Sequence, residues 1–61
     1  MIETHLQNAN LEGANLRKAN LERVFLFGAN LSQACFDEAY LVDANLQDTN
    51  LESASFVSAS F

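Results

Sequence analysis

The chain has 61 residues, of which three are basic and eight are acidic, so its formal net charge is −5. A chain of this length forms one small domain that buries only about 60% of the surface it exposes when unfolded. A single cysteine excludes an internal disulfide, the acidic excess disfavours binding to nucleic acid or anionic membranes, and no run of about 18 apolar residues predicts a membrane span.

From its N-terminus the chain repeats a unit of five residues. A Leu or Phe recurs at every fifth position, and a small or β-branched residue stands two positions before each of them. This spacing of two is typical of a short extended segment with both residues pointing inward. A period of five fits neither an α-helical stripe nor a continuous strand, so each segment must end in a turn and the units must stack. The predicted inner ladder consists of Leu6, Leu11, Leu16, Leu21, Leu26, Leu31, Phe36, Leu41, Leu46, Leu51, Phe56 and Phe61.

The repeated string A(N)Lxx, from Thr4-His5-Leu6 to Ala59-Ser60-Phe61, resembles the pentapeptide-repeat family over essentially the whole chain. The resemblance implies an all-β fold, a right-handed, four-sided parallel β-helix, which is a solenoid with one unit on each side of every coil. Twelve units would then form about three coils of four pentapeptides each, in a single domain of residues 1–61. Coils of twenty residues would also bring opposite charges together on the outside, where such pairs are favourable. The expected pairs include Arg17–Asp37 and Lys18–Glu38.

Asparagine is the commonest residue between the two inward positions of a unit. In coils of twenty residues, Asn10, Asn30 and Asn50 would form a column on the outside of the fold. Stacked amides in such a column could form a hydrogen-bonded ladder. We therefore interpret these asparagines as structural.

The residues that usually perform catalysis are few. His5 is the only histidine and is predicted to point outward, and Cys35 would stack between Asn15 and Ser55 with no basic neighbour in its column. A thiol without a neighbouring positive charge is not activated as a nucleophile. There is no phosphate-binding glycine loop and no metal-ligand spacing, so we expect no enzymatic activity, no cofactor and no metal site.

The segment RVFLFG departs from the repeat at its outward positions. Val24 and Leu26 keep the inner pattern, whereas Phe25 and Phe27 stand where other units carry polar residues. Around the adjacent corner, further apolar residues replace polar ones, and a soluble monomer rarely leaves such a patch in water. Alternatively, the β-propensity of aromatic residues lets them occupy a strand surface without a partner. The candidate interaction surface consists of Phe25, Phe27, Tyr40, Val42 and Ile2.

The ends of the repeat carry no capping element in the sequence. Solenoids usually need polar caps, so we expect either a module or fragment of a longer protein, or a homo-oligomer that forms by end stacking or by side-on contact. We therefore expect a non-enzymatic structural or protein-interaction module, with a protein or another copy of itself as partner and neither nucleic acid nor a membrane. The N-terminal MIETHLQN has no basic-then-apolar run, which predicts a cytoplasmic protein unless a targeting segment has been removed.

The family resemblance also implies an alternative function. Some pentapeptide-repeat proteins mimic the shape and charge of DNA and bind type II topoisomerases such as DNA gyrase, as inhibitors or protectors. The acidic residues of this chain are scattered over different columns instead of forming two phosphate-like tracks. The residues in question are Glu12, Glu22, Asp43, Asp48 and Glu52.

Overall fold

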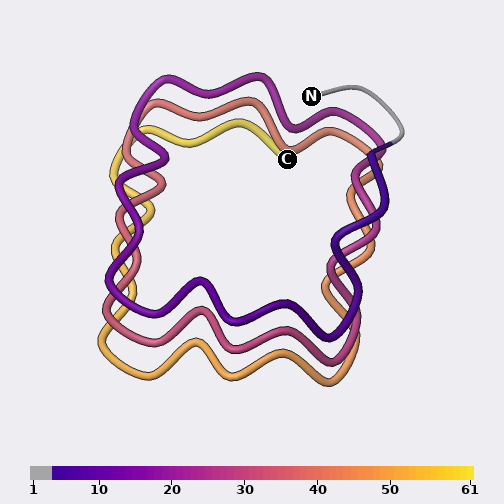
Figure 1. Cartoon of the computed structure of the whole chain (residues 1–61). Helices are drawn as coiled ribbons and strands as arrows, with labels where there is room; N and C mark the ends of the chain where they lie inside the picture. Colours follow the sequence, from indigo (N-terminus) through magenta and orange to yellow (C-terminus); the bar gives the residue numbers. More distant parts are fainter. Residues whose placement is uncertain (1–3) are drawn as a thin grey trace.

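A computed structural model describes residues 4–61, which wind into a coil with a nearly square cross-section (Figure 1). Among these residues there is no helix and no strand longer than one residue, because pairing is confined to isolated parallel β-bridges. Each bridge joins two residues that are twenty apart, so that one circuit of the square takes twenty residues. The bridges are His5–Phe25, Asn10–Asn30, Asn15–Cys35, Asn20–Tyr40, Phe25–Asn45, Asn30–Asn50, Cys35–Ser55 and Tyr40–Ser60.

The square has four sides, and each side stacks one five-residue unit from every coil. Successive coils lie directly on one another, as the indigo, magenta and yellow parts of the trace show (Figure 1). We number the sides in chain order. The first side holds residues 4–8, 24–28 and 44–48, the second 9–13, 29–33 and 49–53, the third 14–18, 34–38 and 54–58, and the fourth 19–23, 39–43 and 59–61.

Backbone hydrogen bonds between one coil and the next follow the same pattern on all four sides. On the first side, the Leu6 N–H donates to the Phe25 carbonyl at 2.8 Å, and the Phe25 N–H donates back to the Thr4 carbonyl at 2.8 Å. The Asn8 N–H in the turn adds a third bond, to the Phe27 carbonyl at 2.9 Å. A single bridging residue is thus enough to fasten each unit to the next coil.

Each of the eleven complete units within residues 4–58 ends in a tight turn. The Ala9 N–H donates to the Leu6 carbonyl at 3.1 Å, and the third residue of this turn, Asn8, has a φ of 61°. A positive φ at that position is the mark of a type II turn. Glycine reaches this left-handed conformation most easily, followed by asparagine and aspartate, but the eleven described turns place residues of many types there. These residues are Asn8, Gly13, Lys18, Arg23, Gly28, Gln33, Glu38, Asp43, Asp48, Ser53 and Ser58.

The repeated asparagines support these turns. Asn30 Oδ1 accepts the backbone N–H of Ser32, two residues later, at 3.1 Å, and Asn10 and Asn50 make the same bond within their own units. The three asparagines do form a column, as expected, but among the described residues no hydrogen bond joins their side chains. Asparagine recurs because it satisfies a turn N–H that the coil-to-coil pairing leaves open.

The apolar core lies inside the square and is most complete in the middle coil. Leucines and Phe36 of the inner ladder are buried there, together with the small residues two positions before them. In the outer coils Leu21 is also buried, Phe61 is exposed, and the other ladder residues are half-buried. Phe36 and Phe56 stack face to face, with ring centroids 4.7 Å apart and planes 1° from parallel. Each buried Leu or Phe contributes about 1.5–3 kcal/mol. The fully buried large side chains are Leu21, Val24, Leu26, Leu31, Phe36 and Leu41.

Phe61 differs from the position that the repeat predicts for it. Its side chain is 70% exposed, although its ring approaches Phe56 at 5.7 Å. The exposure has a simple cause, because no described residue stacks on the outer face of Phe61. We therefore correct its assignment to the inner ladder.

Candidate functional site

The predicted interaction surface lies on the first and fourth sides of the middle coil. Tyr40 is the most exposed of its residues, at 56%, and Phe27 and Val42 are also exposed. All three occupy outward positions, so their exposure costs the core nothing. Ile2, the fifth residue of the predicted surface, lies outside the described residues.

Phe25 is not the exposed anchor that its outward position suggests. It is half-buried, because its ring stacks on the imidazole of His5 in the coil below, with centroids 4.7 Å apart and planes 16° from parallel. Residues twenty apart stand directly above one another, so two rings at bridged positions meet face to face. Phe25 thus forms part of the wall of the first side and offers less of its surface than the sequence indicates.

Two open grooves meet at Tyr40. The first, of about 420 Å³, lies at the edge between the third and fourth sides and is lined by Lys18, Glu38, Tyr40, Ser58 and Ser60. We call the second the Tyr40–Glu22 groove. It has about 290 Å³, runs along the fourth side, and is lined by Asn20, Glu22, Tyr40 and Val42. The sequence pattern identified Tyr40 and Val42, but it missed the polar groove residues, which stand at ordinary repeat positions and carry no signal of their own.

Tyr40 also changes the turn that follows it. In the unit below, Asn20 Oδ1 accepts the backbone N–H of Glu22 at 3.2 Å. Tyr40 occupies the corresponding position one coil higher and has no amide oxygen to offer. Among the described residues, the Val42 N–H consequently has no acceptor. The groove therefore combines an exposed aromatic ring with an unused backbone donor.

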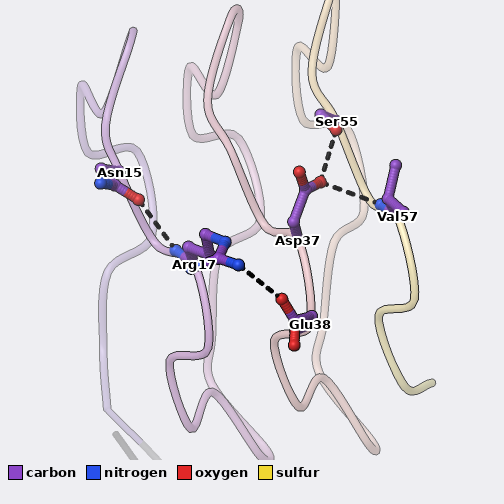
Figure 2. Close-up of polar contacts among 6 residues, drawn as sticks. All are labelled: Asn15, Arg17, Asp37, Glu38, Ser55 and Val57. Atoms are coloured by element: carbon purple, nitrogen blue, oxygen red, sulfur yellow. Dashed lines mark hydrogen bonds and ion pairs between the residues drawn. The ribbon is translucent and has the colours of Figure 1, made fainter.

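The charges on the third side pair diagonally. Arg17 Nη2 contacts Glu38 Oε2 at 2.8 Å, as Figure 2 shows. The sequence predicted that Arg17 would pair with Asp37 and Lys18 with Glu38, because these residues are twenty apart. Asp37 is instead engaged by the coil above, which leaves Arg17 to reach the next carboxylate along the chain.

Asp37 links the second and third coils. Its Oδ1 accepts a hydrogen bond from the Ser55 hydroxyl at 2.5 Å and another from the Val57 N–H at 3.0 Å (Figure 2). It thereby caps the turn after Ser55, where no asparagine is present. The Ser55 hydroxyl, and then the Val57 N–H, hold the pKa of Asp37 below its ordinary value of 3.8.

The remaining reactive residue types stand apart from one another. Cys35 lies in the column between Asn15 and Ser55, and His5 stacks on Phe25. Within residues 4–61, no group of three His, Cys, Asp or Glu side chains is arranged to hold a metal ion. The same stretch contains no helix that is long and apolar enough to cross a bilayer.

Neither the curated proteins nor the solved structures yielded a match to the chain. The family model described as "Pentapeptide repeats (8 copies)", however, matches residues 1–33 and 34–61. These two ranges together cover the whole sequence, and the repeat they describe is the unit that forms each side of the square. The chain belongs to the pentapeptide-repeat family.

Proposed function

We propose that this chain is a non-enzymatic interaction module that binds another protein through the outward apolar side chains of its middle coil. The observation that carries the proposal is the exposure of Phe27, Tyr40 and Val42 at positions where most units have polar residues. Aromatic residues on an otherwise polar surface are the usual anchors of protein contacts. The net charge of −5 further favours a protein partner over nucleic acid or an anionic membrane.

The scaffold we infer for this module is a right-handed, four-sided parallel β-helix. Parallel bridges between residues twenty apart support the inference, as does the strong preference of parallel β-connections for right-handed crossovers. Such a scaffold holds its outward side chains on a rigid backbone fastened in every unit. The module would therefore bind without a large rearrangement.

The proposal is tested with the double variant Phe27→Gln/Val42→Ser and a matched control, Val57→Ser. Val57 is also exposed, at 66%, but it lies on the third side, away from the proposed surface. Affinity capture from an extract of the producing organism should enrich a protein with the wild type and with the control, but not with the double variant. Circular dichroism should show that all three proteins are folded. Equal enrichment by all three would overturn the proposal.

Self-association through the same surface is a separate outcome of this proposal. Sedimentation velocity at tens of micromolar would then show a dimer for the wild type and the Val57→Ser control, and a monomer for the double variant. Dimers that persist in the double variant would point to end stacking of the coils instead. A DNA gyrase supercoiling assay tests the alternative of DNA mimicry, for which inhibition must be lost when the exposed acidic residues are neutralised.

A further inference from the structure

We propose that the Tyr40–Glu22 groove receives an arginine or lysine side chain of the partner protein. This inference rests on the proposed function and specifies the chemistry of the partner. It is carried by four groups that line one groove: the Tyr40 ring, the Glu22 carboxylate, the Val42 side chain and the Asn20 amide. Together these groups match a side chain that is apolar along its stem and cationic at its end.

Tyr40 and Val42 supply the apolar part of the groove. The Tyr40 ring is more than half exposed, so one of its faces is open to a ligand. A guanidinium or ammonium group over such a face is attracted by the ring quadrupole, and the methylene stem of Lys or Arg packs on aliphatic surface. Val42, two residues after Tyr40 in the same unit, provides that aliphatic surface.

Glu22 supplies the opposite charge. Among the described residues no cation pairs with its carboxylate, in contrast to Glu38, whose carboxylate is held by Arg17. The backbone of Glu22 is fixed because its N–H donates to Asn20 Oδ1 at 3.2 Å. The groove thus presents an available carboxylate from an ordered turn, and a partner cation can pair with it without displacing an internal ion pair.

The open Val42 N–H adds a donor beside these groups. No acceptor for it lies among the described residues, because Tyr40 stands where many other units carry asparagine. A main-chain carbonyl of the partner, next to its bound Arg or Lys, would accept this N–H. The groove would then bind an extended basic segment by one side chain and one backbone group.

The neighbouring groove does not offer the same chemistry. Lys18 lines it, and its carboxylate, Glu38, is already engaged by Arg17. A second cation there would meet repulsion from Lys18 and would have to compete with Arg17. The charges therefore select the Tyr40–Glu22 groove of the two.

The direct test is a titration of the ¹⁵N-labelled chain with Nα-acetyl-arginine amide, followed by amide chemical shifts. The control ligand is Nα-acetyl-citrulline amide, which has the same shape without the charge. We expect saturable shifts at Asn20, Glu22, Tyr40 and Val42 with the arginine ligand only. Glu22→Gln should weaken that binding by roughly two- to fivefold, as expected for one exposed ion pair. Equal shifts with both ligands, or no saturable shift with either, would overturn the inference.

A second variant separates binding from folding. Tyr40→Asn restores the common repeat, because the new amide can accept the Val42 N–H while the ring is removed. It should fold at least as well as the wild type and lose the arginine-dependent shifts. Phe25→Asn makes the same kind of change on the first side, where the groove is not affected, and should retain them. Arginine binding by Tyr40→Asn at wild-type strength would refute the proposed role of the ring.

The outcomes also distinguish this inference from the proposed function. If Tyr40→Asn no longer captures the partner protein, but the arginine ligand never binds the wild type, the interaction surface stands and its cationic ligand is wrong. If arginine binds in the groove and no protein is captured through the surface, the groove chemistry stands and the proposed function fails.

Discussion

At the scale of single residues, the fold depends on one backbone conformation that recurs every five positions. Within residues 4–61, nine residues other than glycine adopt a positive φ in the turns, and two turns use glycine. Each such residue without a glycine's freedom costs about 1–2 kcal/mol, which the coil-to-coil hydrogen bonds and the buried ladder must offset. The two glycines have almost the same φ, 71° at Gly13 and 72° at Gly28, but different surroundings.

Alanine substitutions at the two glycines should therefore differ in their effect on stability. At Gly13 a Cβ would meet nothing within 4 Å. Gly13→Ala should therefore lower the free energy of unfolding by only about 1 kcal/mol, the cost of the left-handed conformation for alanine. At Gly28 a Cβ would lie 2.3 Å from Asn8 Oδ1, and Gly28→Ala must also displace that side chain. Urea unfolding should show the larger loss for Gly28→Ala. In an Asn8→Gly background the two losses should become equal, and a persistent difference would contradict this explanation.

Asp37 makes the stability of the coil depend on pH. Its folded-state pKa lies below the ordinary value of 3.8, so the carboxylate stabilises the fold above that pH, and the stabilisation is lost as the pH falls through 3.8 toward the folded pKa. The urea midpoint of the wild type should therefore drop between about pH 6 and pH 3 more than that of Asp37→Asn. Asp48→Asn is the control, because no hydrogen bond engages the Asp48 side chain among the described residues. An equal pH dependence of wild type and Asp37→Asn would exclude this role.

At the scale of the repeating unit, the sequence predicts the inside of the coil better than the outside. The period of five identifies which positions point inward, and the middle coil buries Leu26, Leu31 and Phe36 at those positions. Outward side chains choose among several neighbours, and that choice depends on geometry that no period encodes. Arg17 thus reaches Glu38 instead of Asp37, because the Ser55 hydroxyl and the Val57 N–H already occupy the Asp37 carboxylate.

The candidate site shows the same limit. Tyr40 and Val42 break the polar pattern of the outward positions and can be recognised from the sequence, whereas Glu22 looks like any other turn residue. Phe25 breaks the pattern as well, but its exposure depends on His5 one coil below. A residue's availability for binding is therefore decided by the residue twenty positions away, which a local pattern does not reveal.

Substitutions of Phe36, on the third side, measure how strongly the stability of one unit depends on its ladder residue. Phe36 is fully buried and stacked on Phe56, so Phe36→Ala should cost about 3–5 kcal/mol. A domain of this size rarely has more stability than that, and the variant should be largely unfolded at 25 °C. Phe36→Leu, which restores the common ladder residue, should remain folded with a lower melting temperature. Phe61→Ala removes an exposed ring on the fourth side and should melt close to the wild type. Far-ultraviolet circular dichroism follows these transitions.

At the scale of the whole molecule, three stacked coils give dimensions of 24 × 22 × 15 Å. The shortest dimension agrees with three strands at the usual spacing of about 4.8 Å. Among the described coils the middle one has a neighbour on both faces, and every fully buried core residue except Leu21 belongs to it. Stability should therefore grow with every complete coil that is added between the outer two.

Duplication of residues 24–43 directly after Asp43 tests this dependence. The insert is one full circuit, so it should form a second buried coil and raise both the urea midpoint and the steepness of unfolding. Duplication of residues 24–41 is the control, because eighteen residues place all later units out of phase with the sides. The control should be less stable than the wild type. A longer protein that is no more stable than the original would show that the coils do not add as independent layers.

The hydrogen-bond pattern between coils also gives the molecule a net dipole along the coil axis. In each unit two N–H groups, such as those of Leu6 and Asn8, point toward the later coil, and only one, such as that of Phe25, points back. Two peptide dipoles per unit therefore align along the coil axis against one that opposes them, and each carries about 3.5 D. The positive end lies at the later coils, which is the reverse of the sense in an α-helix. An anion is therefore favoured at the C-terminal end of this stack, where an α-helix would favour a cation.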